Sequence, residues 1–534
     1  FLFLVILLVL GLFPQTIFSQ HYAEKKAWYI DNWPDSVLSW EIYRTSFIGI
    51  PPTRDPYSSG FDVLFYDLAF KSEISKKGNC FGMSVMSLLM LSKGGYYGFC
   101  LPIPQYSGDL YSDLGPSDPN LRKAINAIHG HQLSLPALKF MLDIIARGKQ
   151  RDGIYAYNQF LYYKSKDDPT VISVTKSTSP ADGGHTMVAY DAKIVDGYRR
   201  IYLYDPNRSW ADPAKRTWYT SGKNYITIDS TASHGWTFHH GTDWWSGDPG
   251  GGGNIMIFPL SIVGPTARSP MSLGLSVSDI LAQFFVTGDN SEIEQITNAE
   301  GKRMYIPGTT DIDTNPATGL LNTMPWIPSD DAPAPQPGES SERTLVYFML
   351  GNPRGAVDID LRNGKTGYQL GMVGGTSYIS LRAIGGAGKD LVTLEGAGTT
   401  KPGIIIRNQS NASRYEVQFT QILQPNKRSR IFRVKNLQVQ PEKPVIIQVT
   451  RNQRALEINT TQTGLTYDLE LVNVVQRQPT ILKRKNVRVE AGHRQIIEPK
   501  NWRSLSPQML QIRQAPVKIA PKRLQRLSKQ RMIK

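Results

Sequence analysis

Apolar residues recur at helical spacing in two segments near the start of the 534-residue chain. Residues 81–91 form an almost continuous apolar run followed by Lys-Gly-Gly at 93–95, and a glycine in this position commonly ends a helix. In residues 136–146 a proline suits the first helical turn, and apolar positions follow at intervals of three and four. These patterns predict two helices, whereas residues 21–75 show no clear helical period.

From about residue 183 the pattern changes to short apolar runs separated by Gly, Pro, Asp and Asn, which indicates strands. The predicted strands of this region cover residues 186–192, 200–204, 225–229 and 254–259. Helices followed by strands are typical of an α+β domain.

Residues 326–343 are rich in Pro, Ser and Glu and are typical of a solvated linker. Beyond them almost every run is a short strand with a Gly or Asn turn, which predicts one or two β-sandwich modules. The predicted strands cover residues 344–350, 356–361, 378–382, 403–407, 415–419, 445–450, 467–471 and 487–490. Residues 435–439 and 485–489 share the pattern Lys-Asn-x-x-Val, which is too short by itself to establish a repeat.

The first 13 residues are apolar apart from one glycine and carry no charge. This run is shorter than the ~20 residues that span a membrane and is typical of the core of a signal peptide. We expect cleavage near Ser19 and a truncated extreme N-terminus, because an initial Met and a basic flank are missing. An uncleaved membrane anchor is the alternative. In both cases the protein is expected to be exported, either secreted or held at the cell surface.

A chain of 534 residues exceeds the size of one hydrophobic core, so we expect a multidomain protein. The predicted division is a signal peptide at 1–20, an α+β domain at 21–265, an extension at 266–325, the linker at 326–343, β-sandwich modules at 344–440 and 441–514, and a basic tail at 515–534. After removal of the signal peptide no membrane span is expected.

The net charge of +15 is concentrated in the C-terminal quarter. Residues 401–534 hold 27 Lys and Arg against 7 Asp and Glu, a net charge of +20, so the first 400 residues carry −5. A basic exported surface favours anionic partners, such as an anionic cell-envelope polymer. Specific nucleic-acid recognition is not expected, because the sequence contains no recognised module or basic helical stripe for it.

Cys80 directly precedes the first predicted helix, within Gly-Asn-Cys-Phe-Gly-Met-Ser at 78–84. A thiol at a helix N-terminus faces unpaired backbone N–H groups and the positive end of the helix dipole, and both favour the thiolate. The thiolate is the nucleophilic form of cysteine. Two alternatives remain for Cys80: a disulfide with Cys100, the only other cysteine, or a buried inert thiol.

His185 opens the predicted strand 186–192, and Asp205 follows the predicted strand 200–204. If these strands pair as a hairpin, both residues lie near the same end of neighbouring strands. A carboxylate in that place orients the imidazole, whose other nitrogen then faces the thiol. Asn207, two positions further on, is the alternative third member.

These residues resemble the papain-like cysteine peptidases, in which a Cys opens the central helix and His and Asn or Asp follow on adjacent strands. The resemblance covers about residues 60–260 and rests on the order and spacing of Cys80, His185 and Asp205. It implies a papain-like α+β fold for the N-terminal domain, with these residues as nucleophile, base and orienting group. A peptide or protein would be the substrate, and no cofactor would be needed.

One position departs from that family, which usually has a Gln six residues before the Cys as a donor to the oxyanion. Ile74 occupies this position, so Asn79 becomes the candidate donor, alongside the backbone N–H of Cys80. Loss of one oxyanion donor lowers the rate about 100- to 1000-fold, which leaves a weakened or inactive enzyme as an alternative.

Two groups of histidines lack the Cys or carboxylate at ligand spacing that would complete a metal site, so no metal is expected. They are His129 and His131, and His234, His239 and His240. Residues 234–245 also contain three tryptophans and are expected to line a substrate cleft or to cap the small sheet.

The sequence therefore predicts an exported cysteine hydrolase, expected to be a peptidase, that forms an acyl-enzyme on Cys80. A cell-wall amidase or an acyltransferase would use the same triad. A non-catalytic adhesion or binding protein with a degenerate papain-like domain is the alternative from another class. The missing Gln and the basic, β-rich C-terminal half favour that alternative.

Overall fold

The computed structural model of the chain describes residues 22–517, apart from internal gaps. The longest gaps are 108–114, 177–183, 270–281, 306–319 and 323–345. The predicted signal peptide, the predicted linker and residues 518–534 of the predicted basic tail lie outside the described residues. No helix in the described part is long and apolar enough to cross a membrane.

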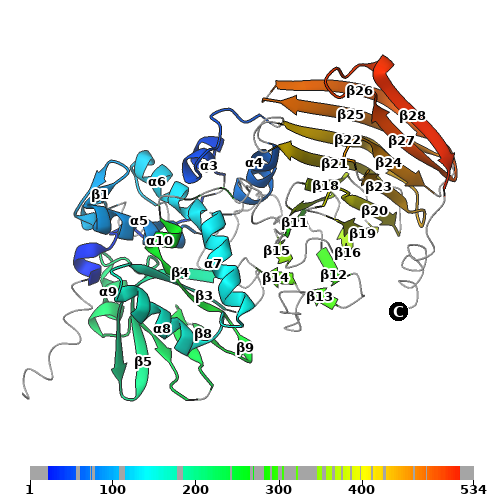
Figure 1. Cartoon of the computed structure of the whole chain (residues 1–534). Coiled ribbons are helices and arrows are strands. Elements are labelled where there is room, and N and C mark those ends of the chain that lie inside the picture. Colours follow the sequence, from blue (N-terminus) through cyan, green and yellow to red (C-terminus); the bar gives the residue numbers. More distant parts are fainter. Residues whose placement is uncertain are drawn as a thin grey trace, which may run out of the picture. The chain divides into compact units, whose positions relative to one another are not determined.

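The chain forms two compact units, shown in Figure 1. The first comprises residues 1–273, 308–340 and 345–349, and the second comprises 274–307, 341–344 and 350–534. Antiparallel sheets dominate the protein, and helices are concentrated in the first unit, as an α+β domain followed by β structure requires.

In the described part of the first unit, the helices up to residue 164 precede the main sheet, and two more lie between or after its strands. They are α3 (Trp40–Ser46), α4 (Gly60–Phe65), the π-helical η1 (Tyr66–Phe70), α5 (Cys80–Lys93), the 3-10 turn η2 (Ile103–Gln105), α6 (Pro119–His129), the 3-10 turn η3 (Gly130–Leu133), α7 (Leu135–Ala146), α8 (Gly153–Lys164), α9 (Pro213–Thr220) and α10 (Leu260–Val263). Both predicted helices are present, as α5 and α7. The segment 21–75, which has no helical period in the sequence, contains the short helices α3 and α4.

An eight-stranded antiparallel sheet follows, in the order β10-β3-β4-β5-β6-β7-β8-β9. Its strands are β3 (Thr170–Thr175), β4 (Gly184–Val195), β5 (Tyr198–Tyr204), β6 (Tyr225–Ile228), β7 (Trp236–His240), β8 (Asp243–Asp248), β9 (Gly251–Gly252) and β10 (Ile255–Pro259). A small hairpin of β1 (Gly95–Tyr96) and β2 (Phe99–Cys100) follows α5. The four strands predicted for this region are β4, β5, β6 and β10.

Helix α5 contacts both β4 and α6, so it is buried on nearly all sides. That position explains its apolar sequence, because a helix surrounded by protein has no polar face to show to water. Gly94 ends α5 in the left-handed conformation, with φ 68°, as the Lys-Gly-Gly sequence predicts.

The predicted hairpin is formed by β4 and β5. Asp196 and Gly197 make its turn, both in the left-handed region with φ of 53° and 80°. Such turns match the twist of paired strands. Val188 pairs with Tyr204, so the start of β4 and the end of β5 lie at the same end of the two paired strands.

The second unit contains two antiparallel sheets. The strands of one run in the order β11-β17-β18-β21-β22-β25-β26, and those of the other in the order β13-β12-β16-β19-β20-β23-β24-β27-β28. Their bounds are β11 (Ala282–Gly288), β12 (Glu292–Asn298), β13 (Arg303–Tyr305), β16 (Ala356–Asn363), β17 (Tyr368–Gly374), β18 (Ser377–Ile384), β19 (Gly388–Glu395), β20 (Gly403–Asn408), β21 (Ser413–Gln424), β22 (Arg428–Val439), β23 (Val445–Val449), β24 (Leu456–Thr460), β25 (Leu465–Val475), β26 (Gln478–Val489), β27 (His493–Pro499) and β28 (Leu510–Pro516). The remaining strands of the chain are β14 (Leu320–Asn322) and β15 (Val346–Leu350), and the 3-10 turn η5 (Pro507–Met509) precedes β28.

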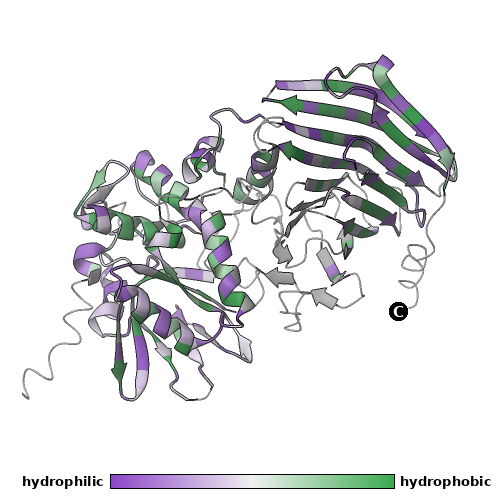
Figure 2. Ribbon diagram, viewed as in Figure 1, coloured by the Kyte–Doolittle hydropathy of each residue, from purple (hydrophilic) through white to green (hydrophobic). Residues whose placement is uncertain are grey.

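Buried hydrogen bonds link the two sheets of the second unit. The hydroxyls of Tyr368 and Tyr415, from one sheet, donate to Asp390 of the other at 2.9 and 2.7 Å. The hydroxyl of Tyr467 donates to Gln495 in the same way. Figure 2 shows polar and apolar segments alternating along the long strands, as for one buried and one open face. This is the arrangement of a β-sandwich.

The sheets of the second unit continue across the predicted boundary between 440 and 441. Strand β22 pairs with β25, and β20 pairs with β23, so the pairing shows one continuous pair of sheets rather than two modules. The predicted extension at 266–325 also contributes strands β11 to β13. The same kind of hairpin occurs on both sides of residue 440, so hydropathy alone contains no sign of this continuity.

The short sequence echo at 435–439 and 485–489 marks a structural repeat. Asn436 in β22 and Asn486 in β26 both have left-handed φ, of 55° and 54°. Each lies in a bulge of its own strand, because residues 435 and 436 stand opposite Glu416 of β21 and residues 485 and 486 stand opposite Asp468 of β25. Asn tolerates the left-handed region better than most residues, which suits it to a bulged position.

Candidate active site

Helix α5 begins at Cys80, with Asn79 in the N-cap position. Both cysteines are free: Cys80 is buried, with an exposed fraction of 1 %, and Cys100 is exposed at the end of β2. The structure therefore does not join them by a disulfide. The first N–H groups of a helix have no partner within it, and in α5 the N–H of Gly82 is bound by a side chain of α6.

Close packing against α6 fixes the first turn of α5. Gly82 donates its backbone N–H to Nδ1 of His129 at 3.1 Å. A Cβ atom at Gly82 would lie 2.4 Å from the carbonyl oxygen of Ile125. Only glycine allows the two helices to approach this closely.

His185 and Asp205 meet at the open end of the β4–β5 hairpin, opposite its turn. Nε2 of His185 lies 2.7 Å from Oδ1 of Asp205, and both residues are 1 % exposed. The same carboxylate oxygen accepts the backbone N–H of Asn207 at 2.9 Å. Nε of Arg208 lies 3.4 Å from the other oxygen, Oδ2. Asp205, and not the side chain of Asn207, is therefore the carboxylate or amide group that contacts His185.

The two buried charges stabilise each other. Burial disfavours the charged imidazole, but the attraction and hydrogen bond of Asp205 outweigh it, so the pKa of His185 is raised to about 10. Burial also opposes ionisation of Asp205, yet His185 and then Arg208 prevail and hold the pKa of this carboxyl well below its ordinary value. At neutral pH the pair is an imidazolium and a carboxylate.

The other ring nitrogen of His185 faces Cys80. The neighbouring Cys80 thiol contributes to the raised pKa of His185, and because Nε2 binds Asp205, Nδ1 is the ring nitrogen left to face it. Within the described part of the chain, Nδ1 has no partner that meets full hydrogen-bond geometry. Such loose contacts between nucleophile and base are common in structures without substrate.

The side chain of Asn79, the donor predicted from sequence, is bound within the core. Its Nδ2 donates to the carbonyl oxygen of Trp33 at 3.1 Å, and the residue is 0 % exposed. The geometry therefore gives no support for Asn79 as a donor to a bound substrate.

A second asparagine, Asn32, lies beside the site and has no signal in the sequence. Its Oδ1 accepts the backbone N–H of Asn79 at 2.5 Å, and its Nδ2 donates to Oδ1 of Asn207 at 2.9 Å. Asn207 Nδ2 in turn lies 3.4 Å from Nε2 of His240. This chain of contacts connects the start of α5 with the ends of the strands that hold His185 and Asp205.

His240 lies next to His185, with ring centroids 5.1 Å apart and rings edge to face. It stacks on Trp245 at 4.4 Å. Part of the segment 234–245 thus lies beside the proposed base, whereas Trp244 is 68 % exposed and packs against His239.

Two further histidines, His129 and His131, bind backbone groups. His129 contacts Gly82 and the carbonyl oxygen of Ile74, and burial lowers the pKa of its imidazole to about 4. His131 contacts the carbonyl oxygen of Val263, and burial has the same effect on its pKa. Among the described residues, no three His, Cys, Asp or Glu side chains are grouped as a metal site requires.

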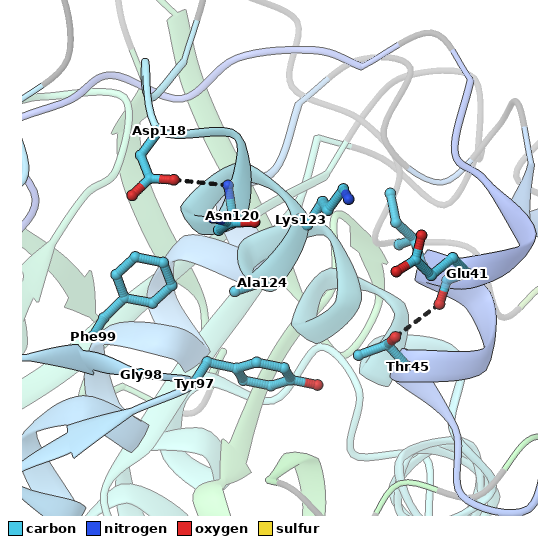
Figure 3. Close-up of a pocket in the computed structure, with 10 residues that line it drawn as sticks. Glu41, Thr45, Tyr97, Gly98, Phe99, Asp118, Asn120, Lys123 and Ala124 are labelled. Carbon is cyan, nitrogen blue, oxygen red and sulfur yellow. Dashed lines mark hydrogen bonds between the residues drawn. The ribbon is translucent and has the colours of Figure 1, made fainter.

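A separate cavity of about 480 Å³ lies between α3, the turn joining β1 and β2, and the N-terminal half of α6, as Figure 3 shows. Its polar groups include the side chains of Glu41, Tyr97 and Lys123. The opposite end of α6 contacts Gly82 through His129. An 11-residue helix is roughly 16 Å long, so this cavity and Cys80 lie at opposite ends of α6.

The site near Cys80 thus combines a thiol at a helix start, a buried imidazole beside it and a carboxylate that fixes the imidazole. Such a set of groups is suited to nucleophilic attack followed by proton transfer. No protein family, curated protein or solved structure matches the chain.

Proposed function

We propose that the chain is an exported cysteine hydrolase of the papain-like class, acting as a peptidase. Cys80 is the nucleophile, His185 the acid and base, and Asp205 the orienting carboxylate. The observation that carries the proposal is the 2.7 Å bond between His185 and Asp205, with the free ring nitrogen turned to a cysteine at a helix start.

In the proposed reaction the Cys80 sulfur attacks the carbonyl carbon of an amide, and the carbonyl electron pair moves to oxygen. When the C–N bond breaks, the imidazolium of His185 gives its Nδ1 proton to the leaving amine. Neutral His185 then takes a proton from water, which attacks the thioester and releases the acid and the thiol. Asp205 keeps the imidazole oriented through both steps.

The charge state of the pair supports this order of events. With the pKa of His185 raised to about 10, the residue is protonated at neutral pH and begins as the acid. The acid is therefore in the required form before substrate arrives.

The burial of Cys80 favours a second candidate function. With 1 % of its surface exposed, the thiol is reached by a substrate carbonyl only after neighbouring groups move. A non-catalytic adhesion or binding protein with a degenerate peptidase domain would retain a buried thiol without such movement. The two functions differ in the reactivity of Cys80.

Alkylation of native, unreduced protein with iodoacetamide at pH 6, read by peptide mass spectrometry, separates the two functions. Cys100 is an internal reference, because it is exposed and lies beside Gln105 and Tyr106 rather than a histidine. We expect Cys80 to react faster than Cys100, and this advantage to be lost in His185→Ala. Slower labelling of Cys80 than of Cys100 in both proteins would contradict the enzyme and favour the binding protein.

An amidase or acyltransferase would use the same groups, since both also pass through a thioester on Cys80. The leaving group and the acceptor distinguish the three reactions. Incubation with peptides, with N-acyl amines, and with peptides plus a free amine, followed by mass spectrometry of the products, assigns the reaction.

A further inference from the structure

A side-chain donor to the carbonyl oxygen would strengthen the proposed hydrolase, and neither position considered from sequence offers an exposed one. Ile74 is apolar and 1 % exposed. Asn79 is fully buried and donates to Trp33. Preorganised N–H groups at the developing oxyanion are among the largest contributions to acyl-transfer catalysis.

The orientation of the Asn32 amide is fixed by its neighbours. A backbone N–H only donates, so the Asn32 atom 2.5 Å from the nitrogen of Asn79 is the oxygen Oδ1. The NH₂ group therefore lies on the other side of the amide. One of its two hydrogens goes to Oδ1 of Asn207. In the described part of the structure, its second hydrogen has no hydrogen-bond acceptor.

Asn32 is also placed where a substrate can reach it. It contacts the peptide immediately before Cys80 and is partly exposed, whereas Cys80 and His185 are buried. A Cβ atom at Gly78 would lie 2.5 Å from Asn32 Nδ2. Gly78, at φ 140°, thus lets the amide lie directly against the chain that leads to the nucleophile.

We propose that Nδ2 of Asn32, together with the backbone N–H of Cys80, donates to the oxyanion, and that Asn207 is a positioning residue for Asn32. The inference rests on the proposed function. When the sulfur bonds to the acyl carbon, the C=O π pair moves to oxygen and both donors bind the resulting negative charge. When the pair returns, the bond to the leaving group breaks and the thioester forms.

Two reactions of the same thiol separate an oxyanion donor from a residue that only holds Cys80 in place. Alkylation by iodoacetamide occurs at a saturated carbon and forms no oxyanion. Acetylation by p-nitrophenyl acetate forms one, and its leaving group needs no proton. Peptide mass spectrometry measures both rates at Cys80, with Cys100 as the reference in the same molecule.

The variants are Asn32→Ala and Asn32→Asp, of which the second keeps the size and the Oδ1 acceptor but lacks the N–H donors. Asn120→Ala is the matched control, because this exposed asparagine lines the cavity at the far end of α6. Near-ultraviolet circular dichroism checks that each variant is folded.

We expect acetylation of Cys80 to fall about 100-fold in both Asn32 variants, with alkylation unchanged within about twofold and the control equal to wild type. Unchanged acetylation would overturn the role of Asn32 and leave the proposed hydrolase intact. Equal loss of both reactions would show that Asn32 only positions Cys80, which also overturns the inference. A wild-type Cys80 inert to both reagents would instead overturn the proposed function.

Discussion

Replacing Asp205 with asparagine removes the charge that holds His185 protonated while keeping the size of the side chain. In the folded protein the pKa of His185 is raised from 6.5 to about 10. At pH 7 this shift corresponds to about 4 kcal/mol of folding free energy linked to the protonation of His185, to which Asp205 makes the largest favourable contribution. Breaking a buried ion pair usually lowers the free energy of unfolding by about 3–5 kcal/mol, which agrees with that figure.

The pH dependence gives the sharper test of this pair. A raised imidazole pKa contributes its full stability below about pH 6.5, and the contribution is lost as the pH rises towards 10. The depressed pKa of Asp205 adds a second loss, in acid, as the pH falls below the ordinary carboxyl value. Wild type should therefore lose more stability than Asp205→Asn between pH 6.5 and 10.

Urea unfolding at about pH 6, 8 and 10, followed by tryptophan fluorescence, measures the difference. Eight of the ten tryptophans lie between residues 28 and 245, so the signal reports mainly on the first unit. The matched control is Asp143→Asn, which removes an exposed ion pair with Arg147 and should change stability by at most about 1 kcal/mol. Parallel curves of stability against pH for wild type and Asp205→Asn would refute the reasoning.

Three further predictions concern packing and charge. Gly82→Ala should lower the free energy of unfolding by about 2 kcal/mol or more, because the alanine Cβ would overlap the carbonyl oxygen of Ile125. A thermal midpoint equal to that of wild type would contradict this. Tyr467→Phe leaves Gln495 without its inter-sheet hydrogen bond and should lower the free energy of unfolding of the second unit by about 1–3 kcal/mol. Urea unfolding followed by far-ultraviolet circular dichroism measures this, and an unchanged midpoint would argue against the bond. Because residues 401–534 carry a net charge of +20, the protein should bind to a dextran sulfate column at low salt and elute near 1 M NaCl, where the Debye length is about 3 Å. Passage through the column at low salt would exclude a polyanion partner.

Elements with a strong local pattern were predictable from the sequence. The apolar run of α5, the proline and apolar spacing of α7, and the Asp-Gly turn between β4 and β5 each lie within one short segment. Helices α6 and α8 were not anticipated, although Asp118 and Asp152 cap their first turns. In α8, tyrosines and polar residues alternate without a clean apolar stripe, so periodicity contains little signal.

The candidate site shows the same limit more clearly. Cys80, His185 and Asp205 could be selected because each stands at the end of a recognisable helix or strand. Asn32 could not, since its hydrogen-bond partner Asn207 is 175 positions away and nothing near Asn32 in the sequence marks it. Proximity in sequence also favoured Asn79, but its place at the start of α5 turns its amide into the core.

The alternation of hairpins between the two sheets of the second unit makes its length adjustable. Left-handed asparagines recur 50 residues apart, at Asn436 and Asn486, and the segment between them supplies β23 and β24 to one sheet and β25 and most of β26 to the other. Removing or duplicating such a segment should shorten or extend the sandwich by one repeat. The packing of the two sheets on each other and the type of strand at the end of each sheet would stay the same.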